Sequence, residues 1–207
     1  MASDDDHVAS PEEMLRVIEE QRAATARWLY GDPLLLYVPW GVAWLLGFTA
    51  LFLHYGLDGH SYAPISQTQA LAVLMSAQLV AGAVAAFGIV RMNRGVRGDH
   101  TARGTMYGYT WFAGMLLVWV ICVRLSSLLP PDESGLAWGG ASLMIVAVMN
   151  MAGGAIWLYW PMFFIGVWVA AVDALGVLLG VGWHALLTAV LLGGGFIVAG
   201  LWLRRRR

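Results

Sequence analysis

The sequence predicts an all-α protein, a polytopic bundle of six transmembrane helices preceded by a short amphipathic helix. Three observations predict it. Hydrophobic residues make up 59% of the 207 positions and charged residues only 12%, about half the charged share of a soluble domain. The apolar residues gather in six runs, and nearly all the arginines lie before the first run, between the second and third runs, or after the last run. A soluble fold of this size lacks the interior to bury so much apolar surface.

Each apolar run is about long enough to cross a hydrocarbon core of roughly 30 Å at 1.5 Å per residue. The six runs are Leu34–Leu53, Ala70–Val90, Met106–Leu128, Ala137–Trp157, Met162–Val181 and Ala185–Leu203. Turn residues break the chain after each run, and the weakest break is Gly182-Trp183-His184, before the last one. The stretch 162–203 is about twice what one crossing needs, so we count it as two spans.

The orientation of the spans follows from the arginines, because positive charge is retained on the cytoplasmic side. Arginines precede span 1, fill the loop between spans 2 and 3, and follow span 6. The opposite loops contain no Arg or Lys, and only Arg124 lies within a span. We therefore expect a multi-pass protein of the cell membrane, surrounded by the lipid bilayer, with its N- and C-termini in the cytoplasm.

A helix with clear start signals is expected before span 1. Ser10, Pro11 and Glu13 form a capping box. One interpretation lays this helix on the inner leaflet. The other makes it a docking helix for a cytoplasmic or membrane protein partner, because residues 1–32 hold eight acids against three arginines and anionic lipid repels an acidic segment. The expected divisions are a disordered acidic N-terminus at 1–9, the amphipathic helix at 10–31, the transmembrane domain at 34–203 and an arginine cluster at 204–207.

An internal repeat is suggested by the odd-numbered spans. Trp40–Gly47 in span 1 and Tyr107–Gly114 in span 3 both fit the pattern aromatic-G-x-x-W-x-x-G, and the even spans contain patches of Gly and Ala. This pattern favours three parallel two-helix hairpin repeats. The alternative is chance, because the chain holds 11 Trp and 25 Gly. In either case the small patches let helix backbones approach closely in lipid.

The same residues show a family resemblance. The chain runs from the Asp32–Tyr37 entry through Trp40–Phe48 and an Arg-Gly loop to Met106–Trp111 and Met151–Trp157. This order resembles a family of small uncharacterised six-helix membrane proteins of high-GC Gram-positive bacteria, over most of the chain. The resemblance implies the six-helix fold and brings no assigned activity, so it implies no catalytic residues.

Ionisable residues at membrane depth are costly, and each is therefore a candidate functional residue. Asp173 lies 12 residues after Pro161, near the expected midplane, and an ion pair with Arg124 of span 3 is geometrically allowed. Three interpretations stay open: a structural pair, a solute or proton pathway, or exposure through misplaced spans. Gln78 and Asn150 are the other candidates for a ligand or proton pathway, although an interhelical hydrogen bond explains each more simply.

Three histidines, His54, His60 and His184, belong to the expected outer side of the membrane. They are candidates for an outer vestibule that is sensitive to pH or that holds a metal. Their spacing contains no H-x-x-x-H pattern, and Cys122 is the single cysteine. We therefore expect no metal site and no cofactor.

The expected function follows from these candidates and from missing motifs. The chain has no Walker-type loop, H-E-x-x-H or G-x-S-x-G motif. We expect an accessory or sensor subunit or a small-solute transporter, either a homo-oligomer or part of a complex, with no nucleic-acid partner. The alternative is an intramembrane enzyme acting on a lipid or isoprenoid, with Asp173 as general acid. A polar path from Asp173 towards one face favours transport, and a closed lipid-accessible chamber favours the enzyme.

Overall fold

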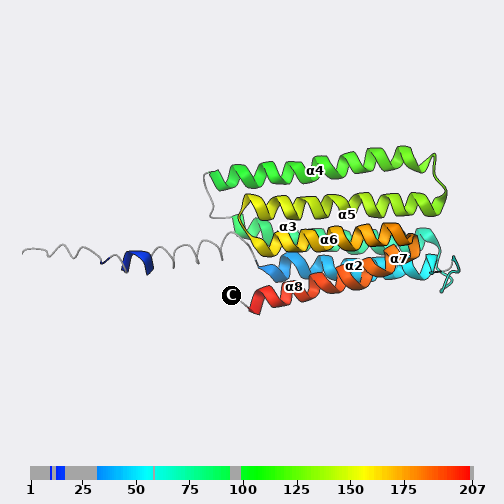
Figure 1. The fold of residues 1–207 in the computed structure, drawn as a ribbon, viewed down its shortest axis with the longest axis horizontal. Helices are drawn as coiled ribbons and strands as arrows, with labels where there is room; N and C mark the ends of the chain where they lie inside the picture. Colours follow the sequence, from blue (N-terminus) through cyan, green and yellow to red (C-terminus); the bar gives the residue numbers. More distant parts are fainter. Residues whose placement is uncertain (1–9, 11–12, 17–31, 58, 94–98, 206–207) are drawn as a thin grey trace, which may run out of the picture.

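The computed structural model describes residues 10, 13–16, 32–57, 59–93 and 99–205, which form helices and no strand. The helices are α2 (Pro33–Tyr55), α3 (Gln67–Asn93), α4 (Asp99–Ser126), α5 (Pro131–Ile156), α6 (Trp160–Leu179), α7 (Val181–Leu187), the π-helix η1 (Thr188–Gly193) and α8 (Gly194–Arg205) (Figure 1). Segments α7, η1 and α8 follow one another without a break and form one span. The described residues thus contain six helices long and apolar enough to cross a membrane. The prediction of an all-α integral membrane protein with six spans is confirmed.

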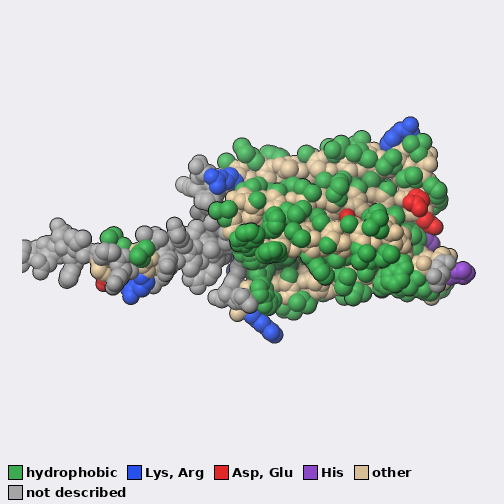
Figure 2. Space-filling view, in the orientation of Figure 1, with side chains coloured by type: hydrophobic (Ala, Val, Ile, Leu, Met, Phe, Trp, Pro, Cys, Tyr) green, Lys and Arg blue, Asp and Glu red, His purple; other side chains and the backbone are tan. Residues whose placement is uncertain are grey.

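The helices run side by side between two ends of the bundle (Figure 1). We call the end where α2 begins and α8 ends the terminal end, and the opposite end, with turns at Gly56 and Gly180, the distal end. Figure 2 shows hydrophobic side chains over the sides of the bundle and charged side chains mostly at its ends. This distribution is the one expected when the sides face lipid.

The centre of the bundle lies between α2, α5, α6 and the sixth span. Helix α2 packs on α3 and along the whole sixth span, and α6 packs on α5. The buried core includes Trp44, Phe48, Leu143, Val169 and Leu192. Helix α4 packs on α5 at the edge of the bundle, and it is the least buried of the six described spans. The central four spans therefore position any buried polar group.

The start of α2 follows from its sequence. The carboxylate of Asp32 accepts a hydrogen bond from the Leu34 amide at 3.0 Å, and Pro33 takes the first helical position. Farther upstream, Ser10 and Glu13 form the reciprocal bonds of a capping box, at 3.0 and 3.2 Å. Most of the segment 10–31, all of 1–9 and residues 206–207 lie outside the described residues. The amphipathic helix as a whole stays a prediction.

The turn between the fifth and sixth spans differs from the predicted one. The chain turns at Gly180, whose φ of +98° ends α6, a conformation that favours glycine. Residues 182–184, expected as the loop, form the first turn of α7 instead. Gly182 is needed for a different reason, because a Cβ atom there would lie 1.7 Å from the Gly56 carbonyl oxygen. The two glycines have separate roles, one in the turn and one in packing α7 on the end of α2.

Candidate functional site

The described part of the membrane domain contains a buried pair of titratable side chains, Asp173 and His184. The Nε2 atom of His184 lies 2.9 Å from Oδ1 of Asp173. Asp173 is 7% exposed and His184 only 3%. The pair joins α6 to α7 across the turn at Gly180. The prediction that His184 belongs to an outer loop is wrong, because the turn comes four residues earlier and leaves His184 inside a helix.

Three glycines line the buried pair, two of them beside His184 and one beside Asp173. A Cβ atom at Gly139 of α5 would lie 2.7 Å from Cε1 of His184, and one at Gly176 of α6 would lie 2.9 Å from its Cα. A Cβ at Gly140 would lie 2.9 Å from Val177 and 3.8 Å from Oδ1 of Asp173. These distances are too short for a side chain at Gly139 or Gly176 without movement of the neighbours. The backbone of α5 and α6 therefore forms the walls of the site.

An aromatic side chain from α2 forms a further wall of the site. The ring of Phe48 on α2 meets the imidazole edge-on, with centroids 6.1 Å apart and planes at 65°. The groups facing His184 are thus Phe48 from α2, Gly139 from α5, and Gly176 and Asp173 from α6. Among the described residues, Asp173 alone forms an ion pair with it.

The pair lies a little beyond the middle of helix α6, and the predicted depth near the bilayer midplane stays a prediction. Helix α6 spans Trp160–Leu179, so Asp173 lies about 5 Å beyond the helix centre towards the distal end, at 1.5 Å per residue. His184 lies four residues after Gly180. The pair is therefore in the distal half of the membrane domain, about two helical turns from the end of α6.

The chemistry of the pair follows from its burial. A net charge held at membrane depth costs several kcal/mol unless it is paired. Two arrangements avoid a net charge, an imidazolium beside a carboxylate and a neutral imidazole beside a carboxylic acid. In both arrangements one proton lies between Nε2 and Oδ1. It is bonded to the nitrogen in the first arrangement and to the oxygen in the second. Loss of one proton from the site would leave a buried negative charge.

Arg124 is not the partner of Asp173. Its guanidinium donates to the Ser127 hydroxyl at 3.1 Å, and the side chain is exposed in the last turn of α4. Helix α4 packs on α5, whereas Asp173 belongs to α6. The ion pair that the sequence allowed is therefore absent from the described structure, because α5 lies between the helices that hold the two residues.

The other predicted pathway residues do not join the pair either. Asn150 is buried on α5, and its amide nitrogen donates to the Val146 carbonyl of the same helix at 2.8 Å. It lies ten residues from Gly140, which faces Asp173, a separation of about 15 Å along the helix. Gln78 is half-buried on α3, which packs on α2. The structure thus brings Asp173 together with none of Arg124, Asn150 and Gln78.

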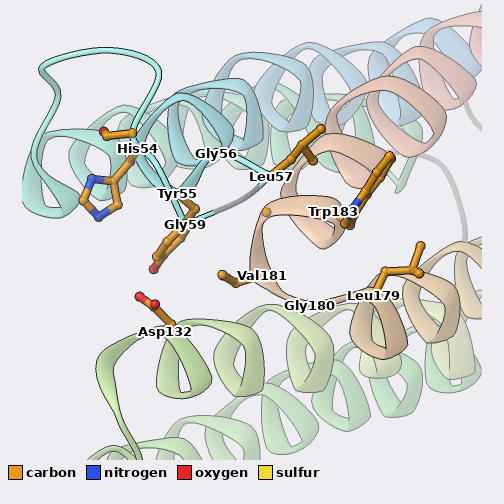
Figure 3. A pocket seen from close by; sticks show the side chains of 12 residues that line it. His54, Tyr55, Gly56, Leu57, Gly59, Asp132, Leu179, Gly180, Val181 and Trp183 are labelled. Atoms are coloured by element: carbon orange, nitrogen blue, oxygen red, sulfur yellow. The ribbon is translucent and has the colours of Figure 1, made fainter.

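A cavity of about 330 Å³ opens at the distal end of the bundle (Figure 3). The end of α2, the start of α5 and the turn between α6 and α7 form its walls. His54 lines it, with Nδ1 2.9 Å from the Ile65 carbonyl oxygen. Trp183, the residue before His184, lines it too. His60 is exposed in the loop that follows α2. The role of His54 and His60 in an outer vestibule stays a prediction.

A π-helical segment begins one turn after His184. Thr188–Gly193 has π geometry, which is rare and frequent at functional sites. The indole nitrogen of Trp168 on α6 donates to the Leu191 carbonyl at 3.3 Å. Thr188 is fully buried, and among the described residues only its hydroxyl is an enclosed side-chain polar atom without a hydrogen-bond partner. The sequence did not predict this segment; the run Gly193–Gly195 at its end is the feature that could have drawn attention to it.

The chain matches no protein-family model, no curated protein and no solved structure. The resemblance to the six-helix family of high-GC Gram-positive bacteria therefore stays a prediction. Any functional conclusion depends on the geometry of the chain itself.

Proposed function

We propose that this integral membrane protein is an accessory or sensor subunit that responds to protonation, and that Asp173 and His184 are the responsive pair. The observation that supports the proposal is the 2.9 Å contact between two buried residues, Asp173 at 7% and His184 at 3% exposure. Intramembrane carboxylates and histidines are characteristic of proton relays and sensors. A structural hydrogen bond of this kind would not need groups that titrate.

The position of the pair gives protonation a mechanical consequence. His184 belongs to the first turn of α7, and a single residue, Gly180, connects this helix to α6. Deprotonation leaves Asp173 charged in a site whose walls include Phe48, Val177 and glycine backbone. Such a charge favours movement of α7 away from α6, towards water at the distal end. The cavity lined by Gly180 and Trp183 lies at that end.

A small-solute transporter is the second candidate. The distal cavity and the titratable pair share the segment 180–184, and transporters couple solute binding to intramembrane protonation at such sites. The enzyme hypothesis has less support. Asp173 is already hydrogen-bonded and lies against Gly140 and Val177, so a lipid substrate would have to displace His184 to reach it.

The distribution of charge supports an orientation and a partner surface. At the terminal end the described arginines are Arg91, Arg103, Arg204 and Arg205, against Arg124 alone at the distal end. We place the terminal end in the cytoplasm of the cell, because positive residues are retained there. The acidic segment 10–31 would then meet a cytoplasmic protein partner, and the protein would work as a homo-oligomer or within a complex.

The proposal is tested by titrating the purified protein in lipid nanodiscs. Difference infrared spectroscopy reports protonation of Asp173, and amide hydrogen exchange reports the opening of residues 180–187. We expect one protonation step that coincides with a change in exchange. Both signals should disappear in Asp173→Asn and in His184→Gln.

His54→Gln is the matched control, because His54 also lies at the distal end but bonds a backbone carbonyl. This variant should keep the transition. A transition that survives in both Asp173→Asn and His184→Gln would show that the response lies elsewhere. Protonation of the pair with no change in exchange would make the pair purely structural.

A further inference from the structure

We propose that the distal cavity is a binding site for a small organic cation, a short-chain alkylammonium. This site is separate from the Asp173–His184 pair, and the inference does not depend on the proton-responsive role of that pair. Three properties of the cavity define its ligand: the sign of its charge, the placement of its polar atoms and its size.

The acidic group described at the cavity is Asp132. It is the carboxylate among the described lining residues, which include no arginine and no lysine. Helix dipoles add little net charge at the cavity. Helices α2 and α6 end there with partial negative charge, whereas α5 and α7 begin there with partial positive charge. A cation is therefore attracted to the cavity and an anion is repelled.

The polar atoms converge from two helices. Figure 3 shows the hydroxyl of Tyr55 and the carboxylate of Asp132 pointing towards each other. Gln67 donates to the Tyr55 hydroxyl at 3.0 Å, which leaves a second lone pair on that oxygen. Gly135 lies one turn after Asp132 and leaves room for the Tyr55 hydroxyl, because a Cβ atom at Gly135 would lie 2.5 Å from that oxygen. An ammonium group between the two oxygens would donate a hydrogen bond to each.

The remaining walls suit an alkyl chain. Trp183 presents an aromatic ring to the cavity, and Leu57, Leu179 and Val181 present aliphatic side chains. An indole attracts a cation and also packs against methylene groups. The end of the cavity near Asp132 is therefore suited to the charged group and the rest to a short hydrocarbon.

The size of the cavity favours an organic ligand over a single metal ion. The volume of about 330 Å³ is roughly ten times the 30 Å³ that one water molecule occupies in the liquid. Among the described residues, no group of three His, Cys, Asp or Glu side chains could hold a metal. A single carboxylate in a chamber of this size fits an organic ammonium better than a coordinated metal.

Isothermal titration calorimetry of the full protein in phosphatidylcholine nanodiscs tests this site. The probes are n-butylammonium, the similarly sized neutral 1-pentanol and the anion pentanoate. We expect saturable binding of n-butylammonium and weaker binding of the other two. Asp132→Asn should reduce n-butylammonium affinity about tenfold, the loss of one charge-assisted hydrogen bond.

Glu133→Gln is the matched control, because Glu133 is the adjacent acid in the same helical turn and does not line the cavity. Its affinity should stay within about twofold of wild type, since exposed charges contribute little. Trp183→Leu should reduce affinity about threefold through loss of the aromatic surface that packs against the alkyl chain. No saturable n-butylammonium binding, equal binding of pentanoate, or equal losses in Asp132→Asn and Glu133→Gln would each overturn the proposal. The pH transition of the Asp173–His184 pair should persist in Asp132→Asn, so the two proposals fail independently.

Discussion

Gly139 of α5 lies so close to the His184 ring that a Cβ atom at this glycine would be 2.7 Å from Cε1 of the imidazole. Among the described glycines, a Cβ atom at Gly176 would come next closest to the ring, at 3.0 Å from Cδ2. The contact fixes the imidazole between α5 and α6 and directs Nε2 to Asp173. The geometry of the titratable pair therefore depends on the absence of a single methyl group.

We predict that Gly139→Ala lowers the free energy of unfolding by about 1–3 kcal/mol, the usual cost of overpacking. Gly108→Ala is the control, because a Cβ at Gly108 has nothing within 4 Å. It should be neutral or slightly stabilising, since alanine is the better helix former. Denaturant unfolding in detergent micelles measures both variants. Equal stability of the two would show that the site relaxes around the added methyl group.

A second prediction separates the two members of the pair. His184→Leu should lower the free energy of unfolding by about 3–5 kcal/mol at neutral pH, because it leaves Asp173 buried without a partner. Asp173→Asn should cost only about 1–2 kcal/mol, because the amide can still bond the ring. The double variant Asp173→Val/His184→Leu should recover much of the larger loss. A double variant less stable than His184→Leu would contradict this account.

A charged residue outside the buried pair provides the control for these variants. Arg124→Gln serves as the control and should change stability by no more than about 0.5 kcal/mol at any pH, because the arginine is exposed and bonds only Ser127.

The buried hydroxyl of Thr188 gives a third prediction. Thr188→Val keeps the shape of the side chain and removes a polar atom that has no hydrogen-bond partner. We expect unfolding free energy to rise by about 1–2 kcal/mol, the desolvation cost of that hydroxyl. Measurement by denaturant unfolding should accompany the nanodisc pH titration. A loss of stability, or a loss of the pH transition, would mean that Thr188 contributes a bond when the π-helical segment rearranges.

The proposed orientation gives a fourth prediction. A membrane-impermeant maleimide added to intact cells should label Glu133→Cys at the distal end but not Gly98→Cys in the arginine-containing loop. The native Cys122 is 1% exposed and should contribute little background. Labelling of Gly98→Cys from outside would reverse the orientation and place the segment 10–31 outside the cell.

The six spans were predictable because apolar length alone decides them. The expected and observed limits agree within a few residues at most ends, for example Leu34–Leu53 against Pro33–Tyr55. The turn at Gly180 was not predictable by the same means. Leu178, Leu179 and Val181 continue the apolar pattern across it, so composition gives no break where the backbone needs one. Gly180 and Gly182 looked equivalent, and only packing shows which of them turns the chain.

Half of the candidate site followed from the sequence. Asp173 was found because a carboxylate in an apolar run is conspicuous, whereas its partner was assigned to Arg124 or to none. A turn at Gly180 places residues four before and four after it face to face, which are Gly176 and His184. Asp173 lies one helical turn below Gly176. The error in the turn therefore concealed the pair, and the order of helices around α5 excluded Arg124.

The one-residue connection at Gly180 has a consequence for biogenesis. Only Gly180 separates α6 from α7, so neither helix can cross the bilayer long before the other. An aspartate alone in a crossing helix costs about 3 kcal/mol on insertion scales. If the two helices leave the translocon as one hairpin, His184 arrives beside Asp173 before either side chain meets lipid. The short turn thus shields the Asp173 carboxylate from lipid during synthesis as well as in the folded protein.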